Sequence, residues 1–98
     1  MTNLFNERIV PGDLVSPRRD MDIVLWPEYE IQTFDGHSGV VLSGAPARFI
    51  NTHSIVLVVA IFDPIEDSDT IVTLYDSMSC SVGYSRLMFL LRVATDGL

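Results

Sequence analysis

The chain has 98 residues, the length of one domain, since stable domains usually run from about 50 to 250 residues. Its apolar share of 48% is too high for a disordered segment, and 6 basic against 13 acidic residues give a net charge of −7. Binding to nucleic acid or to anionic membranes needs clustered Lys and Arg, so this composition disfavours both. We expect one soluble domain over residues 1–98, with its core at about 11–93, and a protein as its partner.

The basic side chains and the cysteine set further limits. The chain has no Lys, and its six basic residues are all Arg. This bias indicates either fixed Arg–carboxylate pairs or the base composition of the genome. Cys80 is the only cysteine, which excludes an intrachain disulfide and a four-thiolate zinc site. We expect Cys80 to be a small buried residue in a reducing environment such as the cytoplasm.

No targeting segment is recognisable. Residues 1–10 lack the positive start and the apolar stretch of a secretory signal. The longest apolar run, residues 55–62, is far shorter than the about 20 residues that a membrane helix requires. We therefore expect neither signal-directed secretion nor a membrane span.

Short runs rich in Val and Ile, broken by Gly, Pro, Asp or Ser, are typical of β-strands. The first strand is expected at 12–16, bracketed by Pro11 and Pro17, and a short second piece at 23–26. Residues 27–38 are expected to form a long loop. Residues 86–89 fit one turn of 3₁₀ helix, and no longer helix is indicated. Further strands are expected at 39–43, 54–63, 70–76, 81–85 and 90–93.

Two of these strands indicate how they are buried. In the strand at 70–76, Val72 and Leu74 share one face and Thr73 lies opposite, which predicts a half-buried strand. The run at 55–62 is apolar on both faces and must be covered on both sides. The second cover is the long loop, the N-terminal residues Leu4 and Phe5, or another subunit. The residues expected in the core are Val72, Leu74, Val82 and Leu91.

The sequence contains no convincing catalytic or metal-binding motif. In Gly36-His37-Ser38-Gly39 the second glycine comes one residue too early for a G-x-S-x-G nucleophile elbow, and a strand follows instead of a helix. A turn explains these residues better. His37 and His53 are the only histidines, and their spacing fits no metal-binding motif. We expect no enzyme, no catalytic residue, no bound metal and no cofactor.

The densest acidic run, residues 63–69, connects two expected strands. A calcium loop alternates oxygen ligands and has a glycine at its sharp turn. Pro64 and Ile65 stand where ligands should be, and the run has no Gly. We expect a solvated hairpin tip here. An adventitious cation site and a contact with a basic partner remain as alternatives.

The aromatic residues of the expected long loop are the best candidates for binding. Trp26, Tyr29 and Phe34 lie close together in sequence, and aromatic side chains on loops commonly anchor protein interfaces. They are equally suited to plugging the end of a small barrel. Val58 and Val59 are added as candidates because one face of the apolar run is expected to contact a partner.

Several landmarks occur in a recognisable order. Pro-Gly-Asp-Leu-Val at 11–15 is followed by a long loop, Gly-Val-Val-Leu at 39–42, Val-Thr-Leu-Tyr-Asp at 72–76, Val-Gly-Tyr-Ser at 82–85, and Leu-Leu-Arg-Val at 90–93. This order resembles small Src-homology-3-like barrels of tailed bacteriophages and environmental sequences. Tyr84 replaces the commoner Trp, and the strand at 55–62 with its acidic loop looks like an additional hairpin. The resemblance implies an all-β barrel of five to six strands with a long first loop and one short 3₁₀ turn.

Such barrels function in assemblies or peptide contacts, and the resemblance implies no reaction. Our leading hypothesis is a non-enzymatic structural or protein-interaction module, a minor component or adaptor of a phage-type assembly. It would be cytoplasmic or virion-associated and homo-oligomeric. The alternative is an acidic inhibitor that masks a basic or nucleic-acid-binding partner. A continuous negative stripe would favour the inhibitor, whereas scattered charges around an apolar patch would favour the module.

Overall fold

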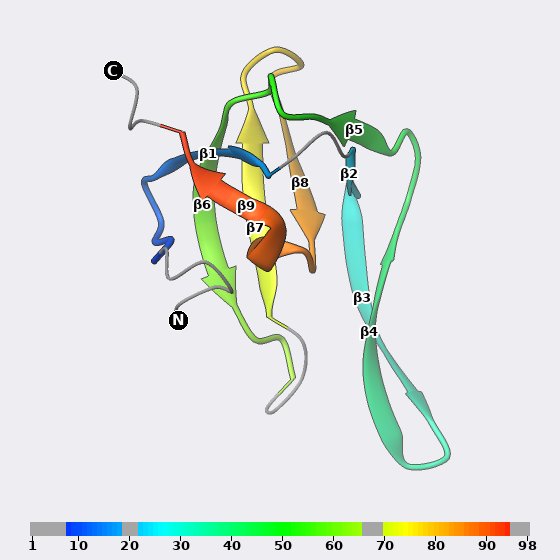
Figure 1. Cartoon of the computed structure of the whole chain (residues 1–98). Helices are drawn as coiled ribbons and strands as arrows, with labels where there is room; N and C mark the ends of the chain where they lie inside the picture. Colours follow the sequence, from blue (N-terminus) through cyan, green and yellow to red (C-terminus); the bar gives the residue numbers. More distant parts are fainter. Residues whose placement is uncertain (1–7, 19–21, 66–69, 95–98) are drawn as a thin grey trace.

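The computed structural model describes residues 8–18, 22–65 and 70–94, which form an all-β structure with one 3₁₀ turn (Figure 1). No helix in these residues is long and apolar enough to cross a membrane. The elements are β1 (Leu14–Pro17), β2 (Ile23–Leu25), β3 (Glu28–Phe34), β4 (His37–Ser43), β5 (Arg48–Ile50), β6 (Val56–Phe62), β7 (Ile71–Asp76), β8 (Ser81–Ser85), η1 (Met88–Leu90) and β9 (Leu91–Val93).

The main sheet has five antiparallel strands in the order β8-β7-β6-β1-β9. Val15 of β1 lies opposite Val56 of β6 on one side and Val93 of β9 on the other. The strand expected at 81–85 has the bounds found for β8, and the other strands of this sheet are confirmed within a few residues. The inner face of the sheet carries the core, which includes Val15, Val56, Val58, Val72, Leu74 and Leu91.

β6 occupies the centre of this sheet. It pairs with β1 on one side and with β7, the next strand along the chain, on the other, so the strand is integral to the sheet. The register shifts between Val58 and Ala60, where a β-bulge changes which side chains face the core. The expected cover from Leu4 and Phe5 lies outside the described residues.

β7 is covered on both faces, so the half-buried prediction is wrong. Ile71, Val72 and Leu74 are fully buried, and Thr73 is 7% exposed. Ile71 lies opposite Phe62, and Thr73 lies opposite Tyr84. Both of these aromatic rings are in turn contacted by Tyr29. The second face of β7 is thus buried beneath aromatic residues that an alternation pattern within β7 does not reveal.

The core prediction is confirmed for Val72, Leu74 and Leu91 and is wrong for Val82, which is 44% exposed. The reason is the neighbouring Gly83, which is buried. A Cβ atom at Gly83 would lie 2.6 Å from Leu25 Cβ, closer than side chains tolerate. Because side chains alternate between the faces of a strand, a core-facing Gly83 places Val82 on the outer face.

Residues 28–43 form a projecting hairpin, the hairpin arm. The strand expected at 39–43 is confirmed as part of β4, whereas the long loop predicted at 27–38 is wrong, because most of it is strand. β3 pairs with β4 from Glu28 opposite Ser43 to Phe34 opposite His37. Asp35 and Gly36 connect the strands with positive φ angles of 52° and 76°, as in a two-residue type I′ turn. The arm extends away from the main sheet (Figure 1), and the molecule is elongated, measuring 48 × 30 × 23 Å.

A second small sheet joins the arm to the core. β2 pairs with β5, a three-residue strand that the sequence analysis did not predict. Trp26 follows β2 and exchanges two backbone hydrogen bonds with Tyr84, of 3.0 and 2.8 Å. Ile23, Leu25 and Ile50 from this sheet enter the core. The described strands form three sheets, of which the main sheet and the β2–β5 sheet share one core, and they do not close into a barrel.

Candidate functional site: the groove beside Arg48

The aromatic candidates do not form one surface. Phe34 is 80% exposed at the far end of the hairpin arm, and Trp26 is half-buried at its base. The ring of Tyr29 lies 5.6 Å from that of Phe62 and 5.0 Å from that of Tyr84, centroid to centroid. Tyr29 therefore covers the outer face of the main sheet. Trp26 lines a groove of about 520 Å³ beside β4, together with Val24 and Leu87.

The structure separates the two valine candidates. Val58 is 1% exposed and belongs to the core, so it is not available to a partner. Val59 occupies the β-bulge of β6 and is 47% exposed. Its neighbour Phe62, on the same strand, is half-buried beneath Tyr29. The second face of the apolar run is thus covered in part by the hairpin arm, as one of the three alternatives expected.

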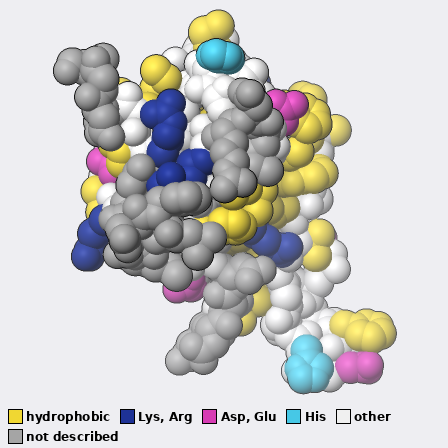
Figure 2. All heavy atoms as spheres, in the orientation of Figure 1, with side chains coloured by type: hydrophobic (Ala, Val, Ile, Leu, Met, Phe, Trp, Pro, Cys, Tyr) yellow, Lys and Arg dark blue, Asp and Glu magenta, His cyan; other side chains and the backbone are white. Residues whose placement is uncertain are grey.

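A different apolar surface lies at the end of the main sheet near the β7–β8 turn, residues 77–80. Phe49, Ile55 and Met78 are 66%, 54% and 92% exposed, and all three line one hollow of about 490 Å³. In Figure 2, hydrophobic side chains lie beside a histidine at the top of the view, where this turn is located. We call this hollow the Arg48 groove; its other lining residues are Arg48, Asn51, His53, Ser54, Asp76 and Ser77.

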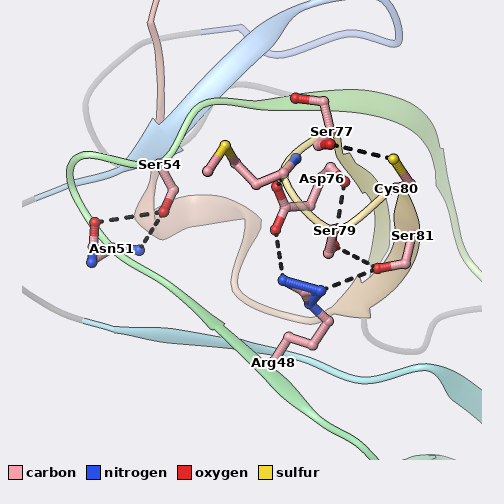
Figure 3. A network of polar contacts seen from close by, with 9 residues as sticks. Arg48, Asn51, Ser54, Asp76, Ser77, Ser79, Cys80 and Ser81 are labelled. Atoms are coloured by element: carbon pink, nitrogen blue, oxygen red, sulfur yellow. Dashed lines mark hydrogen bonds and ion pairs between the residues drawn. The ribbon is translucent and has the colours of Figure 1, made fainter.

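The groove rests on an ion pair between two strands (Figure 3). Arg48 Nη2 of β5 lies 3.1 Å from Asp76 Oδ2 of β7, and Arg48 Nη1 donates to Ser81 Oγ at 3.3 Å. The other carboxylate oxygen of Asp76 accepts the backbone N–H of Met78 at 3.0 Å. The Asp76 side chain is only 9% exposed. One buried carboxylate therefore fixes both β5 and the backbone that carries Met78.

The opposite rim is a tight turn that holds Ile55. The backbone N–H of Asn51 donates to Ser54 Oγ at 3.1 Å, and the N–H of Ser54 donates to the carbonyl of Asn51 at 2.8 Å. The Asn51 side chain accepts the N–H of His53 at 2.9 Å. Short-range hydrogen bonds therefore hold the backbone at both rims, next to Ile55 and Met78.

The polar groups around this end of the sheet are engaged in structural contacts. Cys80 is exposed, which contradicts the buried prediction, because it occupies a turn with a φ of 54° and its thiol donates to the carbonyl of Ser77. The pKa of the Tyr75 phenol is raised above its ordinary value, chiefly by hydrogen bonding and charge interaction with Cys80, and less by burial and by the charge of Asp76. Tyr75 is therefore a neutral phenol at neutral pH.

Metal-ligating residues do not gather in the described part of the chain. Within residues 8–18, 22–65 and 70–94 there is no group of three His, Cys, Asp or Glu side chains that could hold an ion. Of the acidic run, Asp63 is exposed and accepts the Thr70 hydroxyl at 2.8 Å, while residues 66–69 lie outside the described residues. Both His37 and His53 are exposed.

The chain was compared with protein-family models, with curated proteins and with solved structures, and no match was found. The Arg48 groove combines three exposed apolar side chains with a polar floor formed by Arg48 and Asp76.

We expect Asp76→Ala to lower the free energy of unfolding by about 1–3 kcal/mol. The substitution removes an ion pair and a charge-assisted hydrogen bond, and the partly exposed Arg48 is left to water, which moderates the loss. The matched control is Asp63→Ala, which removes an exposed carboxylate and should cost less than about 0.5 kcal/mol. Urea denaturation measures both. Equal effects would show that Asp76 does not anchor the groove.

Proposed function

We propose that this chain is a non-enzymatic protein-interaction module, and that the Arg48 groove receives an extended segment of a protein partner. The observation that carries the proposal is the gathering of Phe49, Ile55 and Met78, each more than half exposed, around one hollow. Soluble monomers rarely leave contiguous large apolar side chains in water, and such patches mark interaction sites. Phe and Met are enriched at interfaces, and Met adapts its shape to different partners.

The partner segment is expected to combine apolar and basic side chains. The chain carries a net charge of −7 and has no Lys. The one carboxylate of the groove floor, Asp76, is neutralised by Arg48, so a basic partner gains little from a direct contact there. The net charge instead raises the rate of encounter with a basic partner, an effect that salt weakens.

A small Src-homology-3-like architecture in a phage-type assembly is the wider setting that we propose. Two features support it. The first strand, β1, lies between β9, the last strand, and β6, which follows the hairpin arm and β5. The single turn η1 comes directly before β9. The role would be that of a minor component or adaptor. Genes for capsid or tail proteins beside the gene for this chain are the expected finding; genes of a metabolic pathway there would contradict it.

The acidic-inhibitor alternative is less well supported. Among the described residues, the acidic side chains that Figure 2 shows on this face lie at separate places. Asp76 is turned inward to Arg48. A mimic of nucleic acid needs regularly spaced exposed charges, and the described acidic residues on this face do not supply them. Scattered charge around an apolar patch is the pattern that favours an interaction module.

The proposal is tested with a phage-displayed library of 12-residue peptides selected on the purified chain. We expect enriched peptides with aromatic or aliphatic residues next to Arg or Lys. A synthetic enriched peptide, titrated into ¹⁵N-labelled protein, should shift the amide resonances of residues 48–55 and 76–78. Enrichment no greater than on a blank surface, or shifts confined to other residues, would overturn the proposal.

Matched variants locate the binding energy. Phe49→Ser should weaken peptide binding at least about tenfold, because exposed aromatic anchors typically contribute more than about 1.4 kcal/mol. Phe89→Ser is the control. Phe89 is likewise an exposed phenylalanine, at 41%, but it does not line the groove. Equal weakening in both variants would contradict a site at the groove. Binding that disappears in salt and ignores both substitutions would indicate the acidic inhibitor.

A further inference from the structure

The hairpin arm presents an open strand edge that the Arg48 groove does not explain. All seven residues of β3 are exposed, and among the described residues no strand other than β4 pairs with it. The other edge of the arm is better protected, since Val40 of β4 is 8% exposed and lines the groove that also contains Trp26 and Leu87. Open edges usually carry Lys, Pro or a bulge that prevents pairing. The arm has no Lys, no Pro and no register shift.

The register of the arm determines which backbone groups of β3 face outward. In a two-residue hairpin the closing pair, here Phe34 and His37, is hydrogen-bonded, and pairs then alternate along the ladder. Tyr29, Ile31 and Thr33 therefore sit in the pairs that do not bond to β4. Their N–H and C=O groups point to the outer edge of β3, where they can bond to another strand.

We propose that β3 pairs antiparallel with β3 of a second copy of this chain, about a two-fold axis at Ile31. In this register Ile31 lies opposite Ile31 of the second copy, and Tyr29 lies opposite its Thr33. All the outward backbone groups of residues 29–33 are then used, in about six hydrogen bonds. The contact is the same patch on both copies, so it closes as a dimer and does not propagate.

The side chains of β3 are self-complementary in this register, which is why the occupant is a second copy. Glu30 lies opposite Gln32 of the second copy, and no carboxylate faces another directly. Cross-strand pairs of this kind stabilise a sheet, whereas like charges opposite each other destabilise it. Gln32 already donates to Glu30 within one chain, which shows that the two side chains are compatible.

The proposed pairing also places the exposed tip of the arm, Phe34, next to the second copy. Phe34 is 80% exposed, and Figure 2 shows a hydrophobic, a histidine and an acidic side chain together at this end of the molecule. With Ile31 on the axis, Phe34 lies opposite Glu28 of the second copy, at the base of its arm. The tip of each arm is thereby brought beside the base of the other arm, next to Glu28 of the second copy.

Sedimentation of the full chain over a concentration series up to about 1 mM tests the dimer, because a contact of this size is expected to be weak. The wild type should show a monomer–dimer equilibrium. Ile31→Pro should abolish it, since proline removes an outward N–H while leaving the β4 side of the strand intact. Ile31→Thr, which keeps that N–H and a strand-favouring side chain, is the control and should retain it. A wild type that remains monomeric throughout would overturn the proposal.

Charge variants test the register. Gln32→Glu places carboxylates opposite each other twice per dimer and should weaken association about 2- to 30-fold, whereas Gln32→Arg should strengthen it by a similar factor. Added salt should strengthen the wild-type dimer, because both copies are acidic. Changes of the same sign in both variants would contradict the register. The dimer does not rest on the Arg48 groove, where salt is expected to weaken peptide binding.

Oxidative cross-linking provides a second measurement that does not depend on proline. In a Cys80→Ser background, Ile31→Cys should form an intermolecular disulfide rapidly, because residues in a hydrogen-bonded antiparallel pair have Cα atoms about 5.5 Å apart, within disulfide range. Phe34→Cys is the control. It is more exposed, yet it lies about 20 Å from its counterpart in the dimer. Faster cross-linking at position 34 than at position 31 would overturn the proposal.

Discussion

Val58→Asp should unfold the chain, whereas Val59→Asp should leave it folded. Val58 is 1% exposed within the core, and an unpaired carboxylate there costs several kcal/mol. A domain of this size is stable by only about 5–15 kcal/mol, so the loss is a large part of the total. Val59 is 47% exposed at the bulge, and its carboxylate would remain in water. Circular dichroism and urea denaturation of the two variants measure the difference.

The pH dependence of Val58→Asp provides its control. Burial raises the pKa of the introduced carboxyl in the folded state above its unfolded value of about 3.9. The folded state therefore binds the proton more tightly, and stability falls as the pH rises from the unfolded to the folded pKa. Val58→Asn, which has a similar shape and no charge, should lack this component. If Val58→Asp folded and Val59→Asp did not, Val59 and not Val58 would point into the core.

The strands of the main sheet could be predicted because each carries its own local signal. β8 was expected with the bounds that it has, and β6 and β7 within two residues, because runs of Val and Ile end at Gly, Pro or Asp. The faces were harder to assign. Val82 was placed inside on its hydrophobicity, whereas the close approach of Leu25 to Gly83 turns it outward. That approach joins segments far apart in the chain.

β3 shows a local signal that was present and was missed. Tyr29 and Ile31 alternate with polar residues, and Asp35-Gly36 is among the strongest two-residue hairpin signals. The acidic and polar side chains lowered the hydrophobicity of the segment, so a loop was predicted. A strand that is exposed along its whole length cannot show the hydrophobic content by which buried strands are recognised.

The Arg48 groove could not be predicted from local pattern at all. Phe49, Ile55 and Met78 belong to β5, to the segment before β6 and to the β7–β8 turn. The Asn51–Ser54 turn leads from β5 to Ile55, and the ion pair between Arg48 and Asp76 joins β5 to the end of β7, beside Met78. The one hint is Met78 itself, an apolar side chain between two serines in a turn, where a polar residue is more usual.

Leu74→Ala should lower the free energy of unfolding by about 2–5 kcal/mol, the range for buried leucines. Leu74 of β7 is fully buried, and it lies opposite Val58 on one side and Gly83 on the other. Gly83 has no side chain that could move into the space left by the leucine. We therefore expect incomplete collapse and a loss in the upper part of the range, measured by urea denaturation.

Val82→Ala is the matched control, because Val82 lies on the strand next to β7 and is 44% exposed. Its truncation should cost less than about 1 kcal/mol, since much of the side chain is already in water. The two substitutions together test the orientation of the sheet. Side chains alternate with a period of two, so an error in one residue of β7 would exchange every inward and outward position of that strand. A loss below about 1 kcal/mol for Leu74→Ala with a larger one for Val82→Ala would require that exchange, and Gly83 would then face solvent and not Leu25.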